Sequence, residues 1–417
     1  MSRSPRARKA RGASRVGERF EAEVGPVAHG GHCIVRVATG PAAHADAVAG
    51  SPARDPRTET RVVFVRHAVP GERVVVEITE GTDGDRFWRG DAVEVLEPSP
   101  DRVTPPCPYA GPGLCGGCDF QHVSLGRQRE LKASVVREQL ARLAGLDVPV
   151  VVEPVEGDEH GLRWRTRVAF ARTSRGELGM RAHRSHRVIP VDDCLIARKD
   201  ARVVFSPGAP VAPVVRVPGA ETVVHERVAT ERFGAHEYAV EADGFWQVHP
   251  GAPRVLVETV LSMLEPRPGE KVMDLYSGVG LFTRFLAEAV GPDGRVVAVE
   301  GDRTASGHAR DNLAGCRGVS VECGSVDRVL AASYDEPFDL VVLDPPREGA
   351  RRTVVEQVAD RAPRAVAYVA CDPAALARDL ATFAELGYAL SALRAFDLFP
   401  MTHHVECVAL LERRPLG

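Results

Sequence analysis

The 417-residue sequence has no apolar run long enough to cross a membrane. Its basic N-terminus lacks the apolar stretch of a secretory signal peptide, so we expect a cytoplasmic protein with no membrane partner. In that compartment the nine cysteines argue against a disulfide framework. An overall excess of positive charge is also missing, since the net charge is -4. This total does not exclude nucleic-acid binding, because such binding depends on a local patch.

Basic side chains are concentrated at the start of the chain. The first fifteen residues contain no acidic residue but six basic ones, Arg3, Arg6, Arg8, Lys9, Arg11 and Arg15. Two interpretations remain open: a disordered tail that aids solubility, or an arm that attracts phosphate groups. The hydrophobic fraction of 44% and the charged fraction of 26% are typical of a soluble globular protein.

Composition changes along the chain in a way that predicts several domains. Short alternating segments punctuated by Gly and Pro indicate a small β-barrel, and a stretch rich in Pro, Gly and Cys follows it. From about residue 240, strand-like and helix-like segments alternate, which is typical of a doubly wound parallel sheet. We therefore expect a basic tail (1–16), a β-barrel (17–97), a central domain (98–240) and an α/β domain (241–417).

Six strand-like segments are expected in the α/β domain, at 271–276, 295–300, 319–322, 338–344, 365–370 and 404–411. Helix-like segments follow several of them, for example 281–290 and 374–386. Ligands of such sheets bind at the carboxyl ends of the parallel strands. Functional residues are therefore expected at those ends.

A glycine-containing loop follows the first of these segments. Gly278 and Gly280 would let a ligand approach the backbone closely, and Glu300, about 20 residues on, could accept both ribose hydroxyls of a nucleoside. A dinucleotide enzyme would fit part of this pattern, but its third glycine is absent and Asp274 precedes the loop. The pattern resembles the S-adenosylmethionine (SAM)-binding half of class I methyltransferases.

The fourth segment ends in Asp344-Pro345-Pro346-Arg347. This resembles the motif with which amino-methylating enzymes act on an exocyclic nitrogen, but those enzymes usually continue with an aromatic residue. Arg347 in that place counts against nitrogen methylation. Cytosine-5 RNA methyltransferases would need a cysteine beside Pro345, and the sequence has none there.

Cys371 and Glu406 are the candidate catalytic residues. Cys371 ends the fifth segment just before a helix, whose positive end should favour a thiolate. The alternative is a packed, inert cysteine. Glu406 stands in an apolar strand, where a carboxylate is costly unless it has a role. It is either a general base of raised pKa or a buried glutamate paired with an arginine or with His403 or His404.

The chemistry of uracil explains why these residues belong together. C5 of uracil is too weak a nucleophile to attack a sulfonium methyl group by itself. Addition of the Cys371 thiolate at C6 would create an enolate that can, and Glu406 would then remove the C5 proton so that the thiol is eliminated. The base has to leave its stack, which implies base flipping or a single-stranded loop.

On these residues the sequence resembles the RNA uracil-5-methyltransferases of rRNA and tRNA over nearly the whole chain. The resemblance implies that Gln247, in Gly244-Phe-Trp-Gln, contacts SAM together with Tyr276, Glu300 and Asp344. It assigns the nucleophile to Cys371 and the base to Glu406. It also implies that the N-terminal barrel is a TRAM domain, an RNA-binding module of OB-like construction. Together with an iron–sulfur cluster, such a barrel is more typical of the rRNA enzymes of the family than of the bacterial tRNA ones. We expect rRNA rather than tRNA as substrate, and a monomer.

The spacing of Cys107, Cys115 and Cys118 calls for a metal or redox explanation. In the family that the chain resembles, these cysteines and Cys194 match the ligands of a [4Fe–4S] cluster. A zinc site is the chemical alternative, since C-x2-C also suits zinc. The choice of iron–sulfur rests on the resemblance, and we expect a structural cluster.

The sequence departs from the family pattern at a few positions. Asp372 follows the nucleophile where Asn is usual, and His249 stands where Asn is usual after Gln247. Leu281 and Ser325 stand where some members have polar SAM contacts. A tRNA enzyme, or an iron–sulfur RNA-binding relative without turnover, remains the alternative. The joint presence of the site residues argues against the latter.

Overall fold

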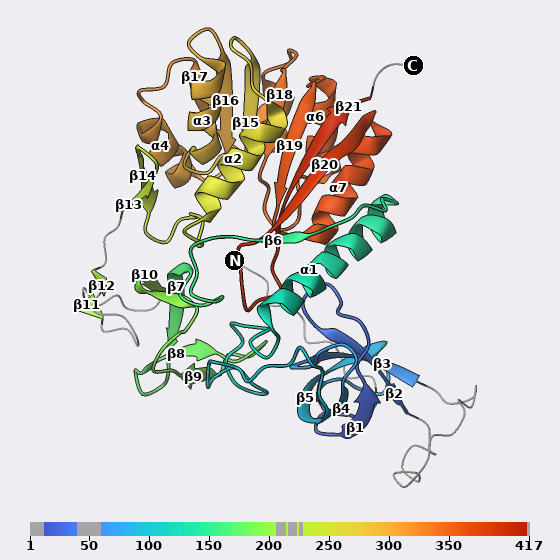
Figure 1. Ribbon diagram of the computed structural model, residues 1–417. Helices are drawn as coiled ribbons and strands as arrows, with labels where there is room; N and C mark the ends of the chain where they lie inside the picture. Colours follow the sequence, from blue (N-terminus) through green and yellow to red (C-terminus); the bar gives the residue numbers. More distant parts are fainter. Residues whose placement is uncertain (1–11, 40–59, 206–213, 216–222, 225–227, 415–417) are drawn as a thin grey trace. The chain divides into compact units, whose positions relative to one another are not determined.

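The computed structural model describes residues 12–39, 60–205, 214–215, 223–224 and 228–414 (Figure 1). The chain forms two compact units, one of Met1–Arg127 with Ala182–His186 and one of Gln128–Arg181 with Arg187–Gly417. Most of the expected basic tail lies outside the described residues. Among those described, every helix is too short or too polar to span a membrane.

The first unit is built on a five-stranded sheet that curls into a barrel-like form. Its strands, in the order β1-β4-β5-β3-β2, are β1 (Arg19–Glu23), β2 (Cys33–Ala38), β3 (Thr60–Arg66), β4 (Arg73–Glu80) and β5 (Phe87–Glu97). The chain after β1 approaches β2, because Gly25 N donates to Ile34 O and Ile34 N donates to Pro26 O, both at 2.9 Å. Burial alternates along β2 and β4, so the period-2 pattern correctly predicted strands with one inward face.

The second unit begins with elements that lie outside the expected α/β domain in sequence. They are α1 (Leu125–Gln139), the π-helical turn η2 (Leu140–Ala144) and β6 (Val152–Pro154). A small sheet of order β10-β7-β8-β9 and two hairpins follow: β7 (Arg165–Arg172), β8 (Leu178–Arg181), β9 (Val188–Pro190), β10 (Ala197–Phe205), β11 (Val214–Val215), β12 (Val223–Val224), β13 (Val228–Phe233) and β14 (His236–Glu241).

The main sheet has eight strands in the order β17-β16-β15-β18-β19-β21-β20-β6. Those after β14 are β15 (Lys271–Leu275), β16 (Arg295–Glu300), β17 (Val319–Cys323), β18 (Leu340–Leu343), β19 (Ala365–Ala370), β20 (Tyr388–Asp397) and β21 (Glu406–Arg413). The first five of these run parallel, and β21 is antiparallel to both β19 and β20. All six expected strands are present, whereas β20 and the addition of β6 were not predicted.

Helices cover both faces of this sheet (Figure 1). They are α2 (Ala252–Leu264), α3 (Leu281–Val290), α4 (Arg303–Asn312), α5 (Val326–Ala332), α6 (Arg351–Asp360) and α7 (Pro373–Glu385). One core lies under α2 and α3, and the other lies under α5, α6, α7 and α1. Strands β18 and β19 are buried at every position, as expected for strands covered on both faces. The predicted doubly wound α/β architecture is thus confirmed.

Residues from the expected central domain complete the edge of the main sheet. Strand β6 pairs in parallel with β20, with Val152 opposite Ala395. The Arg394 guanidinium binds the Glu153 carboxylate through two hydrogen bonds of 2.9 and 2.7 Å. The expected boundary between residues 240 and 241 stays a prediction, but the sheet itself draws on residues from both sides of it.

Candidate active site

The candidate residues of the second unit gather at the carboxyl ends of neighbouring parallel strands. Glu300 ends β16, Asp344 follows β18 and Cys371 follows β19. Strand β15 lies between β16 and β18; the helix after β15 covers one face of the sheet and the helix after β18 covers the other. Such a reversal opens a crevice outside the strand ends, which is where ligands bind in open α/β sheets.

The loop after β15 is shaped by residues with positive φ. Tyr276 (φ 65°), Gly278 (φ 55°) and Gly280 (φ 93°) all adopt left-handed backbone conformations. A Cβ atom added to Gly280 would come within 2.8 Å of the Leu313 side chain. Glycine at this position therefore lets α3 begin close to the end of α4.

Glu300 ties this loop to the end of β16. Its Oε2 accepts a hydrogen bond from Gly278 N (2.8 Å) and its Oε1 accepts one from Asp302 N (2.7 Å). A carboxylate oxygen can accept more than one hydrogen bond. The half-buried Glu300 therefore retains capacity for the ribose hydroxyls that the sequence led us to expect there.

Several carboxyl groups lie close together at the ends of β15, β16 and β18. Asp274 is fully buried; its Oδ2 accepts from the Thr283 hydroxyl, while its Oδ1 has no hydrogen-bond partner among the described residues. Burial, with a contribution from the charge of Glu300, raises the pKa of Asp274 to about 7. Burial and the charges of Asp274 and Glu300 raise the pKa of Asp344 to about 7. A cationic ligand would stabilise the ionised forms, and SAM, with its sulfonium and ammonium groups, fits this site.

Cys371 and Glu406 are brought together by strand register. Strands β19 and β21 pair antiparallel, with Ala370 opposite Cys407. Continued one residue past the end of β19, this register places Cys371 opposite Glu406, and the charge of Glu406 acts on the pKa of Cys371. Opposite residues of an antiparallel pair point to the same face with Cβ atoms about 5 Å apart. Residues 35 positions apart in the sequence thus meet at one point.

The sequence led us to expect that the following helix end favours a thiolate at Cys371, but in the ligand-free protein its effect is outweighed. Burial, followed by the negative charges of Glu406 and Asp344, raises the pKa of Cys371 to about 12. Arg347 lowers it, but by less. The N-terminus of α7 does lie next to Cys371, and Asp372 caps it by accepting from Ala375 N (2.8 Å). Partial burial among carboxylates outweighs this helix end, so the thiol keeps its proton at neutral pH.

Glu406 is buried as the first residue of β21, opposite Phe396 of β20. Burial and the charge of Asp344 hold its pKa well above the ordinary value, while Arg347 lowers it. The Arg347 guanidinium also contacts His404 Nε2 at 3.3 Å. A carboxyl group of raised pKa can accept a proton and keep it near neutral pH, as a general base requires.

A buried network that the sequence analysis missed holds the loop after Asp344. The Asp379 Oδ2 of α7 accepts from the Tyr368 hydroxyl (2.6 Å) and from Ala350 N (2.7 Å). A Cβ atom on Gly349 would approach this oxygen to 2.6 Å. Two features of the sequence could have indicated this network: a tyrosine within an apolar strand and an aspartate among the apolar residues of a helix.

Gln247 is half-buried in the segment that leads into α2. Its neighbour Trp246 is buried against Tyr238, with ring centroids 5.2 Å apart. His249 is almost completely buried and stacks on Trp164 at 6.0 Å. Burial lowers the pKa of His249 to about 4, so this replacement of the usual Asn is neutral at pH 7.

Three of the expected metal ligands, Cys107, Cys115 and Cys118, lie half-buried in one loop of the first unit. Gly117 N donates to Cys115 Sγ and Gln121 Nε2 donates to Cys118 Sγ, both at 3.4 Å. The same Gln121 accepts a hydrogen bond from Cys107 N (3.2 Å).

Cys194 belongs to the second unit, where its carbonyl oxygen accepts from the Arg163 guanidinium at 3.2 Å. In the part of the chain that the structure describes, no three or more His, Cys, Asp or Glu side chains form a group that could hold a metal ion. The assignment of the four cysteines to a metal therefore stays a prediction.

Three family models match the chain. A TRAM domain model matches residues 13–93, a "methyltransferase small domain" model matches 252–367, and a "tRNA (uracil-5-)-methyltransferase" model matches 326–414. The last match contains Asp344, Cys371 and Glu406. The matches therefore coincide with the barrel-like sheet and with the main sheet.

Relatives of similar length cover nearly the whole chain. A protein of Streptomyces coelicolor described as an uncharacterized RNA methyltransferase is 45% identical over 97% of this chain and 95% of its own length. A 23S rRNA uracil-C5-methyltransferase of Shewanella amazonensis is 32% identical over 84% of this chain and 91% of its own length. These two matches extend across both units.

Among solved structures, the tRNA (uracil-54, C5)-methyltransferase of Pyrococcus abyssi in complex with S-adenosyl-L-homocysteine has a similar fold. The TM-score is 0.62 at 22% identity, with 84% of this chain and 94% of that chain covered. At this identity the likeness supports the fold, and the SAM-methyltransferase architecture expected from the sequence is thereby confirmed.

Replacing Glu300 by Gln should weaken SAM binding about 10-fold or more, measured by calorimetric titration. An amide can accept only through its oxygen, so one of the two backbone donors, Gly278 N or Asp302 N, loses its partner. Hydrogen bonds to charged groups contribute roughly 1.5–3 kcal/mol. Glu356→Gln, on the exposed face of α6, is the matched control and should leave the affinity unchanged. Wild-type affinity in Glu300→Gln would contradict this role.

Alkylation should show Cys371 to be protonated in the ligand-free protein. At pH 8, iodoacetamide should modify Cys371 more slowly than the exposed Cys323, as followed by peptide mass spectrometry, because only the thiolate reacts. The rate at Cys371 should keep rising toward pH 12. Glu406→Gln should accelerate the modification and Arg347→Ala should slow it. Faster modification of Cys371 than of Cys323 at pH 7 would mean that the thiol is already ionised.

Proposed function

The chain belongs to the RNA uracil-5-methyltransferase family, and from this premise we propose that it methylates a uridine of 23S rRNA through a covalent bond to Cys371. Its activity as a SAM-dependent RNA (uracil-5-)-methyltransferase follows from the family. The covalent adduct, the named catalytic residues and the choice of rRNA are the proposal.

The observation that carries this proposal is that the register of β19 and β21 leads Cys371 to Glu406, whose charge acts on the Cys371 thiol, with Asp344 acting on both. A nucleophile and a proton acceptor on one face of a sheet can act on the two adjacent carbons of one uracil ring. The residues expected to bind SAM lie at the ends of the neighbouring strands β15, β16 and β18. The three groups that C5 methylation needs therefore lie at one edge of the sheet.

In the proposed reaction the Cys371 thiol loses its proton to solvent, and its sulfur bonds to C6 of the uracil. The electron pair of the C5–C6 double bond moves toward O4, and the resulting enolate takes the methyl group at C5. The ionised Glu406 removes the C5 proton, the double bond re-forms and the Cys371–C6 bond breaks. SAM supplies the methyl group and, while bound, a positive charge. The products are 5-methyluridine, S-adenosylhomocysteine and one proton.

The pKa values of Cys371 and Glu406 are raised in the free protein, so bound RNA and SAM have to lower both for the reaction to proceed. In the free protein both Cys371 and Glu406 hold protons more tightly than usual because of burial and nearby carboxylates. Arg347 is a cation that lowers the pKa of both. We propose that Arg347 keeps the thiolate and the enolate accessible once substrate and SAM are bound.

Three departures from the family pattern are compatible with activity. Asp372 caps α7 through Ala375 N, which an asparagine oxygen would also do, although its charge adds to the raised pKa of Cys371. Ser325 is the N-cap residue of α5, and Leu281 is buried at the start of α3. Both thus have structural positions that do not depend on a SAM contact.

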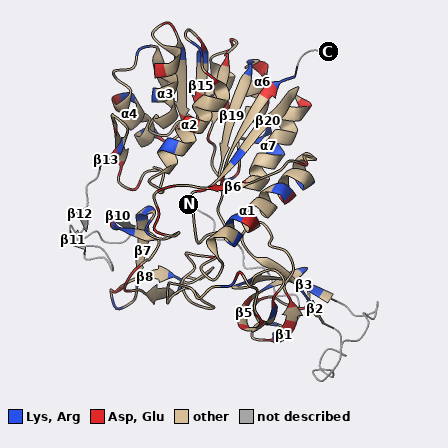
Figure 2. Cartoon of the chain, viewed as in Figure 1, with Lys and Arg blue, Asp and Glu red and all other residues tan. Residues whose placement is uncertain are grey.

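Support for rRNA over tRNA comes from the relatives. The proteins of Shewanella amazonensis and Acinetobacter baylyi that are named for 23S rRNA are 32% and 30% identical over more than four-fifths of this chain. The matching family model that is named for tRNA covers only residues 326–414. Acidic and basic residues alternate along the described part of the chain, so RNA affinity would depend on local groups (Figure 2).

The test uses 5-fluorouridine-containing transcripts of 23S rRNA and of tRNA, mixed with SAM and the anaerobically purified protein, and a denaturing gel. Fluorine at C5 cannot leave as a proton, so the enzyme should remain bonded to the rRNA transcript. Cys371→Ala should lose the shifted band. Glu406→Gln should accumulate a band even on ordinary rRNA, because elimination is blocked after methyl transfer.

Trapping on the tRNA transcript alone would overturn the rRNA proposal but keep the mechanism. The absence of an adduct on either RNA, with SAM binding demonstrated, would favour a non-catalytic RNA-binding relative. A wild-type band that persists in Cys371→Ala would show that another residue is the nucleophile.

We also propose that Cys107, Cys115, Cys118 and Cys194 ligate a [4Fe–4S] cluster. The proposal rests on the match to the family's four cysteines, and it is supported by the donors to Cys115 Sγ and Cys118 Sγ. Four cysteine ligands leave no open iron position, so the role of the cluster would be structural. No step of the reaction above depends on it.

Elemental analysis tests the cluster. Anaerobically prepared protein should contain iron and acid-labile sulfide in equal amounts and show broad visible absorption. Cys118→Ser and Cys194→Ser should each lose the absorption, whereas Cys323→Ser, at an exposed position, should keep it. Stoichiometric zinc without sulfide would identify the alternative metal site. Folded protein with neither metal would contradict both.

A further inference from the structure

Helix α1 buries two polar side chains against the segment that connects β20 to β21. Gln128 is completely buried, and the exposed fraction of Lys132 is 1%. Lysine is rarely buried to this extent unless its charge is compensated. Both side chains contact residues more than 260 positions later in the chain, between Asp397 and Met401.

Lys132 forms a buried ion pair with Asp397, the last residue of β20. Its Nζ lies 2.6 Å from Asp397 Oδ1 and donates a second hydrogen bond to Phe399 O (3.0 Å). Such a pair gains little stability over an apolar replacement, because both charges lose their hydration. Its specific effect is geometric, since it fixes the direction in which the chain leaves β20.

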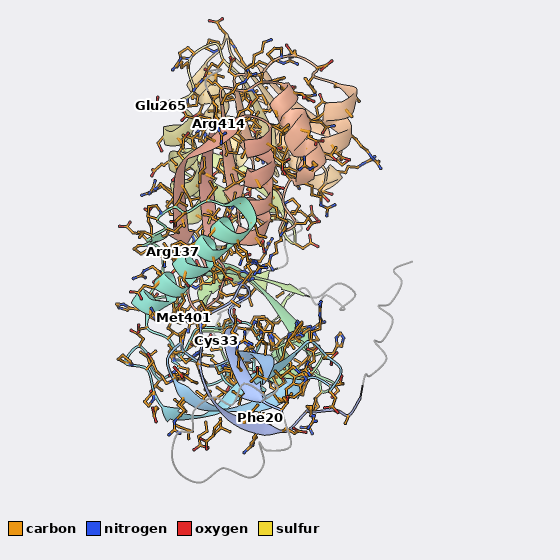
Figure 3. All side chains as sticks on the ribbon, turned by 90° about the vertical axis from the view of Figure 1, so that its right-hand side faces the viewer. Phe20, Cys33, Arg137, Glu265, Met401 and Arg414 are labelled. Carbon is orange, nitrogen blue, oxygen red and sulfur yellow. The ribbon has the colours of Figure 1, made fainter. Side chains whose placement is uncertain are left out.

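Gln128 holds the next part of the same segment. Its Oε1 accepts from Met401 N (2.9 Å) and its Nε2 donates to Met401 Sδ (3.3 Å). Met401 has a φ of 66°, a left-handed conformation that a non-glycine residue adopts only when its surroundings enforce it. Figure 3 shows Met401 beside one end of α1.

The held segment leads directly into Glu406. The Thr402 hydroxyl donates to Phe399 O (2.8 Å) and accepts from His404 N (3.3 Å). The His404 ring packs against the Phe399 ring at 5.8 Å. Val405 is buried, and Glu406 opens β21. Contacts therefore run from α1 to His404, two residues before the base.

We propose that Lys132 and Gln128 are positioning residues that hold the Asp397–Met401 segment so that Glu406 meets C5 of the bound uridine. This inference rests on the proposed function, since it deepens the role of Glu406 there. Neither side chain touches the reacting atoms in this scheme. The loss of either should impair the step that needs Glu406, which is proton removal and release of Cys371, rather than methyl transfer or SAM binding.

The experiment compares Lys132→Met, Gln128→Leu and the double variant Lys132→Met/Asp397→Asn on ordinary rRNA transcript. Each should accumulate the methylated covalent adduct on a denaturing gel, as Glu406→Gln does, with turnover about 100-fold lower, the size expected for an active-site group displaced by about 1 Å. The affinity for SAM should stay within about twofold of wild type. The double variant removes both buried charges and should restore the melting temperature without restoring turnover.

The matched control is Arg361→Met, which removes a buried cation that binds Leu330 O at 2.6 Å between α5 and α6. It should lower the melting temperature without producing an adduct. An adduct in this control, or a folded double variant with wild-type turnover and no adduct, would overturn the inference alone. A wild type that is not trapped by 5-fluorouridine RNA would overturn the proposed function and this inference with it.

Discussion

The antiparallel pairing of β21 between β19 and β20 is the constraint on which the site depends. Five parallel strands can place residues at a common edge, but each contributes only the residue at its own carboxyl end. An inserted antiparallel strand brings its first residue to that edge, so Glu406 arrives opposite Cys371. A slip of one residue in this register would move Glu406 to the other face of the sheet, because side chains alternate along a strand.

Burial at this edge determines how the site titrates. Burial raises the pKa of Asp274, Asp344 and Glu406; the charge of Asp274 adds to this effect at Asp344, and the charge of Asp344 adds to it at Glu406. The same burial keeps Cys371 protonated. A bound cationic ligand reduces the repulsion between these carboxylates. The free protein therefore lacks a positive charge that a ligand such as SAM supplies. Affinity for SAM and activation of the thiol then have a common physical origin.

Segments that lie far apart in the sequence build the outer edge of the main sheet. Strand β6 and helix α1 come from residues before the α/β region. Strand β6 pairs with β20, and Lys132 of α1 holds Asp397 at the end of β20. The Trp164 ring contacts His249, which follows Gln247, and Phe399, which lies between β20 and β21. The site therefore rests on contacts between residues that no local pattern connects.

The sequence alone determined the features that local spacing encodes. Strand patterns and left-handed turns leave local signatures in the sequence. They made it possible to predict the glycine loop after Asp274, the acid that ends β16, the Asp-Pro-Pro turn and the six strands. Only the tertiary structure revealed the ionisation state of Cys371, strand β20, the Tyr368–Asp379 network and the buried Lys132–Asp397 pair. Each depends on which residues meet across long separations and on how much water they exclude. A helix end is visible in the sequence, whereas the carboxylates that outweigh it at Cys371 are brought there only by the fold.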